Sequence, residues 1–328
     1  MDKGLTEERA SDAPYSWGEC PQRIFDEICS RPRPGGHVIT FANEKGGVGK
    51  STLAFNTAVA LANAGASVAA IDLDARQGSL SKALEQRAAT ARCLSAPIAC
   101  PAAAKVEKNG AAQILQEIAR IGASADFVVL DTAGSDTPLG RRAVALADTL
   151  VTPINASDFD LDLLGRFDPV DRRLIEPGPF ARTVVDLAAE RESRMGARPD
   201  WVVVKNRNRS KERHQQSRID ATLAELVRAY GIRVAASMAE RVTYRELLHF
   251  GLTQGDLARI PQLARHRKRD HGTELERFLA ELRLPTRVVA SEQKPQRKPL
   301  HPPTLRERYL QGLRADAGCR DLTPELAD

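Results

Sequence analysis

The sequence predicts an α/β fold: a doubly wound, mainly parallel sheet with helices on both faces. Short apolar segments recur along the chain, segments with helical periodicity separate them, and a glycine-rich stretch follows the first apolar segment. This alternation is typical of βαβ units, which set strands in parallel and cover the sheet with helices. With 328 residues, of which 42% are hydrophobic, the chain can bury one large core and still carry additional segments.

The glycine-rich stretch, residues 43–52, predicts a phosphate-binding loop. It follows the strand-like residues 38–41 and precedes a helical pattern, which gives the order strand, loop, helix. Backbone N–H groups of such a loop turn onto phosphate oxygens, and the positive end of the helix dipole adds to them. Lys50 is expected to neutralise the β- and γ-phosphates, and Ser51 to ligate Mg²⁺. The expected nucleotide contacts are Gly46, Gly47, Val48, Gly49, Lys50, Ser51 and Thr52.

Carboxylates follow two further predicted strands. Residues 68–71 end in Asp72 and Asp74, and residues 127–130 end in Asp131. Acidic residues at the carboxyl ends of parallel strands face the ligand crevice, and Mg²⁺ in such a site keeps part of its water shell. We therefore expect Asp131 to bind Mg²⁺ through water. An Asp-x-Asp after a strand also suits a helix cap or a solvated turn, but the phosphate loop upstream favours a nucleotide site.

The loop departs from the common Walker pattern, since Glu44 stands where that pattern has glycine and a lysine follows at 45. The stretch Lys-Gly-Gly-x-Gly-Lys-Ser-Thr resembles the deviant Walker ATPases, the group that contains ParA, MinD and MipZ. The resemblance implies that Lys45 reaches the partner's phosphates across a nucleotide-sandwiched dimer. It also implies that Asp72 supports the Mg²⁺ network, that Asp74 positions the attacking water, and that Asn206 reads the adenine base.

Three other stretches are similar to the MipZ family of division-site ATPases: residues 157–165, 201–207 and 241–253. Ala133 departs from the family, which usually has proline there. The resemblance implies slow, Mg²⁺-dependent ATP hydrolysis, with Lys45, Lys50 and Asp74 as catalytic residues and Ser51, Asp72 and Asp131 at the metal. The implied partners are a second copy, nonspecific DNA, a ParB-like protein and FtsZ. A ParA-type partition ATPase is the alternative, and a MinD-like membrane cycler is less favoured.

A basic stripe begins near Lys205, with a single acid, Glu212, inside it. No aromatic residue interleaves with these cations, which favours binding to a duplex backbone over base stacking. An ordinary solvated basic face is the alternative, and the resemblance to the MipZ family favours DNA. The expected DNA-binding residues are Arg207, Arg209, Lys211, Arg213 and Arg218.

The composition predicts three parts. Residues 1–36 are expected to be a largely disordered extension, in which Ile24, Phe25 and Ile28 could share a helical face that docks on the core or on a partner. Residues 37–284 form the ATPase domain. Residues 285–328 form a proline-rich basic linker and a short amphipathic helix, for which docking is expected and membrane attachment is not.

The expected location is the cytoplasm, and the resemblance to the MipZ family implies that the protein lies on the nucleoid there. No apolar segment approaches the length of a membrane span, and the first residues are acidic where a signal peptide is apolar. The net charge of +5 leaves room for local basic patches that favour an anionic partner.

Overall fold

A seven-stranded sheet forms the centre of the computed structural model, which describes residues 19–106, 111–155, 157–206, 213–239, 242–260 and 272–285. Its strand order is β3-β2-β4-β1-β5-β8-β9. The strands are β1 (His37–Phe41), β2 (Val68–Asp72), β3 (Ala102–Lys105), β4 (Phe127–Asp131), β5 (Thr149–Asn155), β8 (Asp200–Asn206) and β9 (Arg233–Ala235). All neighbouring strands in this sheet pair in parallel. The predicted fold class is confirmed.

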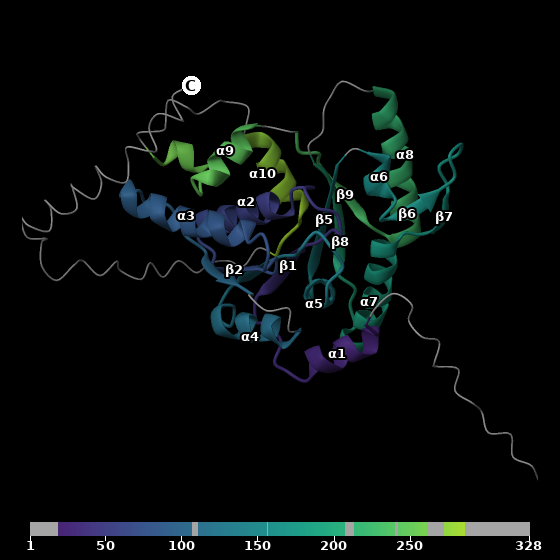
Figure 1. Cartoon of the computed structure of the whole chain (residues 1–328), viewed down its shortest axis with the longest axis horizontal. Coiled ribbons are helices and arrows are strands. Elements are labelled where there is room, and N and C mark those ends of the chain that lie inside the picture. The colour runs from purple at the N-terminus through teal and green to yellow at the C-terminus, as the bar shows by residue number, and fades with distance from the viewer. Residues whose placement is uncertain are drawn as a thin grey trace, which may run out of the picture.

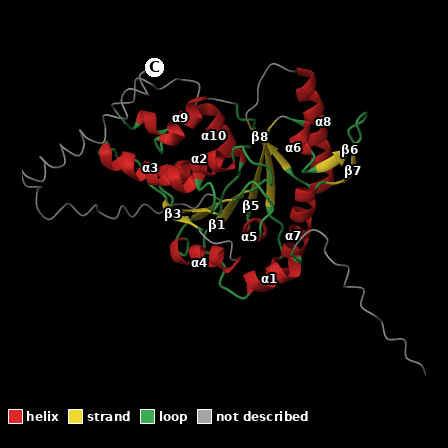
Figure 2. Cartoon of the chain, in the orientation of Figure 1, coloured by secondary structure: helices red, strands yellow, loops and turns green. Residues whose placement is uncertain are grey.

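Helices cover both faces of the sheet (Figures 1 and 2). One layer contains α2 (Lys50–Asn63), α3 (Ser79–Cys93), α9 (Val242–His249) and α10 (Gly272–Glu281). The other contains α1 (Pro21–Cys29), α4 (Ala111–Ile121), α5 (Pro138–Leu146), α7 (Pro179–Met195) and α8 (Arg213–Tyr230). Among the described residues, no helix is long and apolar enough to cross a membrane.

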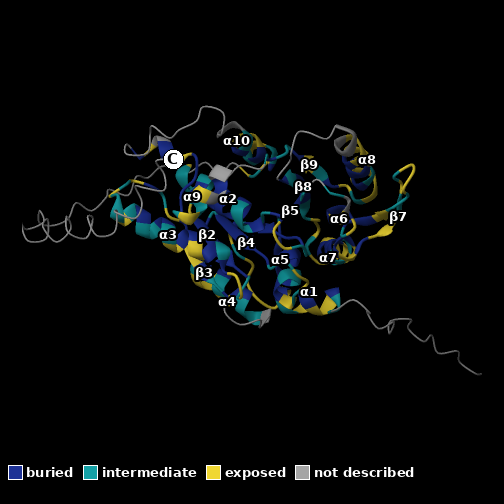
Figure 3. Ribbon diagram, turned by 45° about the horizontal axis from the view of Figure 1, so that its top comes forward, coloured by how far each residue is buried: buried dark blue, intermediate teal, exposed yellow. Residues whose placement is uncertain are grey.

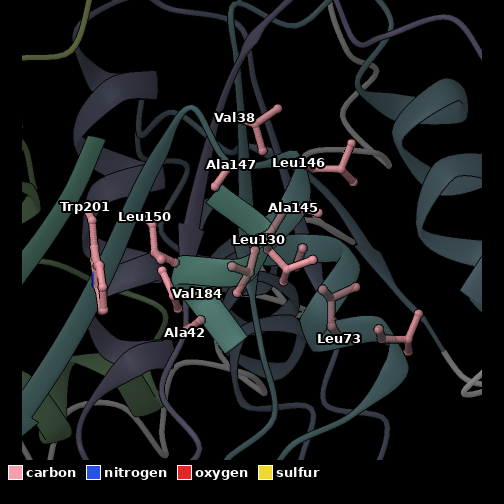
Figure 4. Packing of buried hydrophobic residues seen from close by; sticks show 14 of the residues in the cluster. Val38, Ala42, Leu73, Leu130, Ala145, Leu146, Ala147, Leu150, Val184 and Trp201 are labelled. Carbon is pink, nitrogen blue, oxygen red and sulfur yellow. The ribbon is translucent and has the colours of Figure 1, made fainter. Parts of the chain in front are cut away.

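The sheet has a hydrophobic core on each of its two faces. Alternate residues of each central strand belong to one core or the other, because successive side chains point to opposite faces of a sheet. Val38 of β1 and Leu130 of β4 pack with α1, α4, α5, α7 and α8. Ile39 and Val129 pack with α2, α3 and α10 instead. Figure 4 shows the first of these cores, in which Trp201 and Leu150 stand beside Val184 of α7. The central strands are consequently buried on both sides (Figure 3), as a near-continuous apolar sequence requires.

Several short elements are absent from the sequence-based interpretation. The two edge strands, β3 and β9, contain four and three residues, too few to show a period. Residues 157–165 follow β5 in the chain. They form a single turn, α6 (Asp158–Leu161), after which β6 (Gly165–Phe167) and β7 (Leu174–Pro177) make an antiparallel hairpin beside α8. The connection to α10 also carries a short 3-10 helix, η1 (Asp256–Ala258).

Helix α1 corrects the domain boundary that the sequence predicts. Ile24 and Phe25 are fully buried against α5 and α7, so the expected helical face exists and docks on the core. Arg142 of α5 is also buried, and its guanidinium binds the carboxylates of Glu19 and Glu27 at 2.6–3.0 Å. The chain from Glu19 onward therefore belongs to the packed domain, and a largely disordered extension up to residue 36 is wrong for this part. Residues 1–18 and 286–328 lie outside the described residues.

Replacing Phe25 by alanine should lower the free energy of unfolding by about 3 kcal/mol, because a fully buried aromatic side chain leaves a cavity. Arg23→Ala on the exposed side of the same helix is the matched control and should change stability little. Urea unfolding followed by circular dichroism measures both. Equal stability of the two variants would show that α1 does not contribute to the core.

Candidate functional site

The carboxyl ends of the parallel strands bring the predicted site residues to one edge of the sheet. The register pairs Asp131 at the end of β4 with Phe41 of β1 on one side and with Asp72 of β2 on the other. Asn206 ends β8 opposite Asn155 of β5. The phosphate loop leaves β1 between these strands, which is where open α/β sheets bind their ligands.

The phosphate loop requires glycine at two positions. Gly47 and Gly49 have φ angles of +76° and +95°, in the left-handed region that side chains rarely adopt. A Cβ atom on Gly49 would lie 2.0 Å from Nδ2 of Asn206, so the loop also lacks room for one. Helix α2 begins at Lys50, as expected, and directs its amino-terminal N–H groups toward the loop. The loop is thus built to hold an anion.

Two side chains brace this loop from inside. Nζ of Lys50 donates a hydrogen bond to the carbonyl of Lys45 at 2.8 Å, and Nδ2 of Asn206 donates to the carbonyl of Val48 at 2.8 Å. Burial lowers the pKa of Lys50, while the charges of Asp131 and Asp74 oppose that shift. Ser51 and Thr52 lie in the first turn of α2. Asn206 therefore contacts the loop directly, and its role toward adenine stays a prediction.

Asp131 is the residue whose surroundings best match a metal ligand. It is fully buried, and within the described part of the chain neither carboxylate oxygen has a hydrogen-bond partner. Burial, reinforced by the charge of Asp72 and only partly opposed by the Ser51 hydroxyl and the Lys50 charge nearby, raises its pKa to about 8. A buried carboxylate without partners is unfavourable unless a cation joins it, which fits Mg²⁺. The described residues contain no cluster of three or more His, Cys, Asp or Glu side chains suited to a metal.

The carboxylates of Asp72 and Asp74, in contrast to that of Asp131, accept hydrogen bonds from backbone N–H groups. The two oxygens of Asp72 accept hydrogen bonds from the backbone N–H of Asp74 and of Ser81, both at 2.9 Å. Asp72 thus ties the end of β2 to the start of α3, and burial raises its pKa. Oδ1 of Asp74 accepts from the N–H groups of Arg76 and Gln77 in a local turn. Their assigned roles toward Mg²⁺ and water stay predictions.

The lysine at the start of the loop has a partner that sequence reasoning missed. Nζ of Lys45 forms an ion pair with Oδ1 of Asp160 in α6. Leu161 and Leu164 are buried, and Asp160 is fully buried as well, although acidic side chains are mostly exposed in proteins. Alternating acids in this segment were the only signal, and nothing in them distinguishes Asp160 from its exposed neighbour Asp162.

The loop after Asp131 packs closely on the phosphate loop. A Cβ atom on Gly134 would lie 2.8 Å from the Cα atom and 2.9 Å from the backbone nitrogen of Gly46. Beside this contact lies a small pocket that includes Glu44, Asp136 and Arg141. Burial, with the charge of Asp136, raises the pKa of Glu44. The two loops therefore touch through their backbones, so that movement of one displaces the other.

Gly134→Ala should weaken ATP binding by roughly 10- to 100-fold, because the added methyl group forces the phosphate loop away at a cost of about 1–3 kcal/mol. Gly35→Ala is the matched control, since its Cβ would meet only the carbonyl oxygen of Ala123 at 3.8 Å. Calorimetric titration with Mg·ATP measures both variants. Unchanged affinity in Gly134→Ala would contradict the proposed backbone contact between the loops.

The structure describes part of the predicted basic stripe. Lys205 at the end of β8 pairs with Asp220 of α8 at 2.6 Å, so this charge is neutralised. Arg218 is exposed on α8, and Arg213 is the first residue of that helix. Arg207, Arg209 and Lys211 lie outside the described residues. Binding of DNA by these five arginines and lysines stays a prediction.

A family model described as ATPase MipZ matches residues 37–286. The chain belongs to the ATPase MipZ family. A curated relative, the chromosome-partitioning ATPase Soj of Thermus thermophilus, is 36% identical over 143 residues, which cover 38% of this chain and 57% of that protein. The chain thus matches little more than half of that relative's length.

Two solved structures share the fold of this MipZ family member. Apo McdA from Cyanthece superposes with a TM-score of 0.50 at 16% identity, covering 76% of this chain and 99% of that one. The septum site-determining protein MinD from Pyrococcus horikoshii OT3, complexed with Mg-ADP, gives 0.50 at 13% identity, covering 76% and 96%. At these identities the likeness shows the fold alone.

Proposed function

We propose that the chain is an ATPase that hydrolyses Mg·ATP slowly and dimerises when ATP is bound. The observation that carries this proposal is the meeting of the phosphate loop, the unpartnered Asp131 carboxylate and Lys45 at one sheet edge. Membership of the MipZ family supports it, and so does the presence of Mg-ADP in a MinD protein of the same fold.

Each residue has a distinct task in this proposal. The backbone of residues 46–49 and the Lys50 amine hold the phosphates, and Asn206 keeps the loop in shape through Val48. Ser51 and Asp131 would hold Mg²⁺, which neutralises charge on the phosphates when bound. Asp74, half-exposed at the same edge, would orient the water. Lys45 would add its charge from the partner subunit, as an arginine finger does in other phosphoryl-transfer enzymes.

DNA binding would follow dimerisation. If each subunit neutralises about five phosphates, the slope of log K against log salt is roughly −4 to −5 per subunit and doubles in the dimer. Monomers would therefore bind DNA weakly and dimers well, without sequence preference. This would place the ATP dimer on the nucleoid within the cytoplasm, and a ParB-like protein would be a further partner.

The cellular role we propose is positioning of the division plane by inhibition of FtsZ assembly away from midcell. Family membership supports it. The test is light scattering by FtsZ of the same organism polymerising with GTP, with the protein added alongside ATP or ADP. Inhibition with ATP alone is the expected result, and inhibition that does not depend on the nucleotide would contradict the proposal.

Partition of a plasmid, chromosome or other cargo is the second candidate, and the similarity to the Soj partitioning ATPase favours it. Its nucleotide chemistry and DNA binding would be the same, and only the cargo would differ. The light-scattering experiment separates the two, because a partition ATPase leaves FtsZ polymers unaffected in both nucleotide states. Membrane cycling in the manner of MinD would need residues 305–313, which lie outside the described residues.

A further inference from the structure

The contact between Lys45 and Asp160 conflicts with the task proposed for Lys45. A lysine that reaches a partner's phosphates must leave whatever it binds in its own chain. Here its ammonium group pairs with a carboxylate that is itself fully buried in α6. The Lys45 side chain remains 37% exposed, whereas the side chain of its acceptor, Asp160, is fully buried.

Asp160 is held in place by more than the lysine. Its second oxygen, Oδ2, accepts a hydrogen bond from the backbone N–H of Asn155 at 2.6 Å, where β5 ends. Leu161, the last residue of α6, and Leu164, which follows the turn, are buried in the core. The carboxylate therefore cannot swing out to follow the lysine without disturbing α6. The backbone of Lys45 is fixed as well, since its backbone N–H donates a hydrogen bond to Oδ1 of Asn43 at 2.9 Å.

Among the described residues, departure of Lys45 leaves the Asp160 carboxylate with one backbone hydrogen bond and no cation. A buried carboxylate that loses its partner is unfavourable, because desolvation is no longer offset by a nearby positive charge. The single chain thus stabilises the position of Lys45 that is unproductive for dimerisation. A dimer forms only when the free energy gained from the contacts of Lys45 with the partner's nucleotide exceeds the free energy lost at Asp160. A triphosphate favours this exchange more than a diphosphate does, because it offers the lysine more negative charge.

We propose that Asp160 is a positioning residue that retains Lys45 within its own subunit and so sets the threshold for nucleotide-dependent dimerisation. This inference rests on the proposed function, in which Lys45 acts in trans. Asp160 makes dimerisation selective for ATP, because the weaker attraction of ADP does not release the lysine.

The test uses Asp160→Asn, which keeps an oxygen for the Asn155 N–H and removes the charge, with Asp162→Asn as the control. Asp162 lies two residues after Asp160 and is exposed. Its replacement by asparagine therefore removes the same charge without affecting the ion pair with Lys45. Sedimentation equilibrium with Mg²⁺ and a non-hydrolysable ATP analogue gives the dimer dissociation constant. Loss of one charge-assisted hydrogen bond in the monomer should lower that constant about tenfold or more in Asp160→Asn. A measurable dimer with ADP should also appear.

A second measurement reports on the ion pair itself. Reductive methylation of the nucleotide-free protein, followed by mass spectrometry of the peptide that contains Lys45, should proceed several-fold faster in Asp160→Asn than in the wild type or in Asp162→Asn. Equal labelling, or a dimer constant in Asp160→Asn that is unchanged or weaker, would overturn the proposal. Failure of the wild type to dimerise with the analogue counts instead against the proposed function. In that case dimerisation of Asp160→Asn still supports the inference, and its failure to dimerise overturns it.

Discussion

Replacing Lys45 by alanine should lower the rate of ATP hydrolysis by roughly 10³-fold, the lower end of what a cation supplied in trans contributes to phosphoryl transfer. The physical reason is that the positive charge reaches the transferring phosphate only in the dimer, where it offsets developing negative charge. ATP affinity of the single chain should change little, because the backbone of residues 46–49 and Lys50 still hold the phosphates. Phosphate release measured under saturating ATP tests the rate, and calorimetry tests the affinity.

The control for that variant is Lys82→Ala, which removes an exposed lysine from α3. It should hydrolyse ATP at the wild-type rate. Hydrolysis by Lys45→Ala within a few-fold of the wild type would show that Lys45 does not act on the reacting phosphate. A parallel loss of ATP affinity would place Lys45 in the cis phosphate site instead.

Asp131→Asn should abolish Mg²⁺-dependent hydrolysis while making the metal-free protein more stable. Contributions of a bound metal to charge stabilisation are worth several kcal/mol, so we expect a loss of about 10³-fold in the rate. The gain in stability arises because the variant no longer buries an unpartnered carboxylate. The control is Glu85→Gln, which removes the charge of an exposed residue of α3 and should change neither the hydrolysis rate nor the stability. Phosphate release and thermal unfolding measure the two effects.

The raised pKa of Asp131 predicts how the stability of the metal-free protein depends on pH. Burial and the charge of Asp72 raise the pKa of Asp131 from its ordinary 3.8 to about 8 in the folded chain. Between these values the folded chain retains a proton that the unfolded chain has released, so the free energy of unfolding falls as the pH rises through this window. Asp131→Asn should flatten that part of the profile in chelator. A decline of the same size in the variant would assign the pH dependence to other groups.

Much of the site could be predicted from the sequence because its chemistry depends on local patterns. The loop between β1 and α2 follows from glycine spacing, and Asp72 and Asp131 follow from acids that end apolar strands. Parallel pairing then brings them together at one edge, which is a general property of this fold.

What the sequence could not indicate depends on contacts between distant segments. Asp160 lies 115 positions from Lys45, and its burial depends on how the turn of α6 packs at the end of β5. Helix α1 docks through Glu19 and Glu27 onto Arg142, which no local pattern pairs with them. The edge strands β3 and β9 are too short for a periodic signal, and pairing with β2 and β8 alone defines them.

Sedimentation of the wild-type protein with Mg²⁺ and either a non-hydrolysable ATP analogue or ADP tests the central claim most directly, because every proposed function depends on a dimer that only ATP supports. We predict twice the monomer mass with the analogue and the mass of a single chain with ADP. The same mass in both nucleotide states would contradict an ATP-controlled dimer, and with it the role of Lys45.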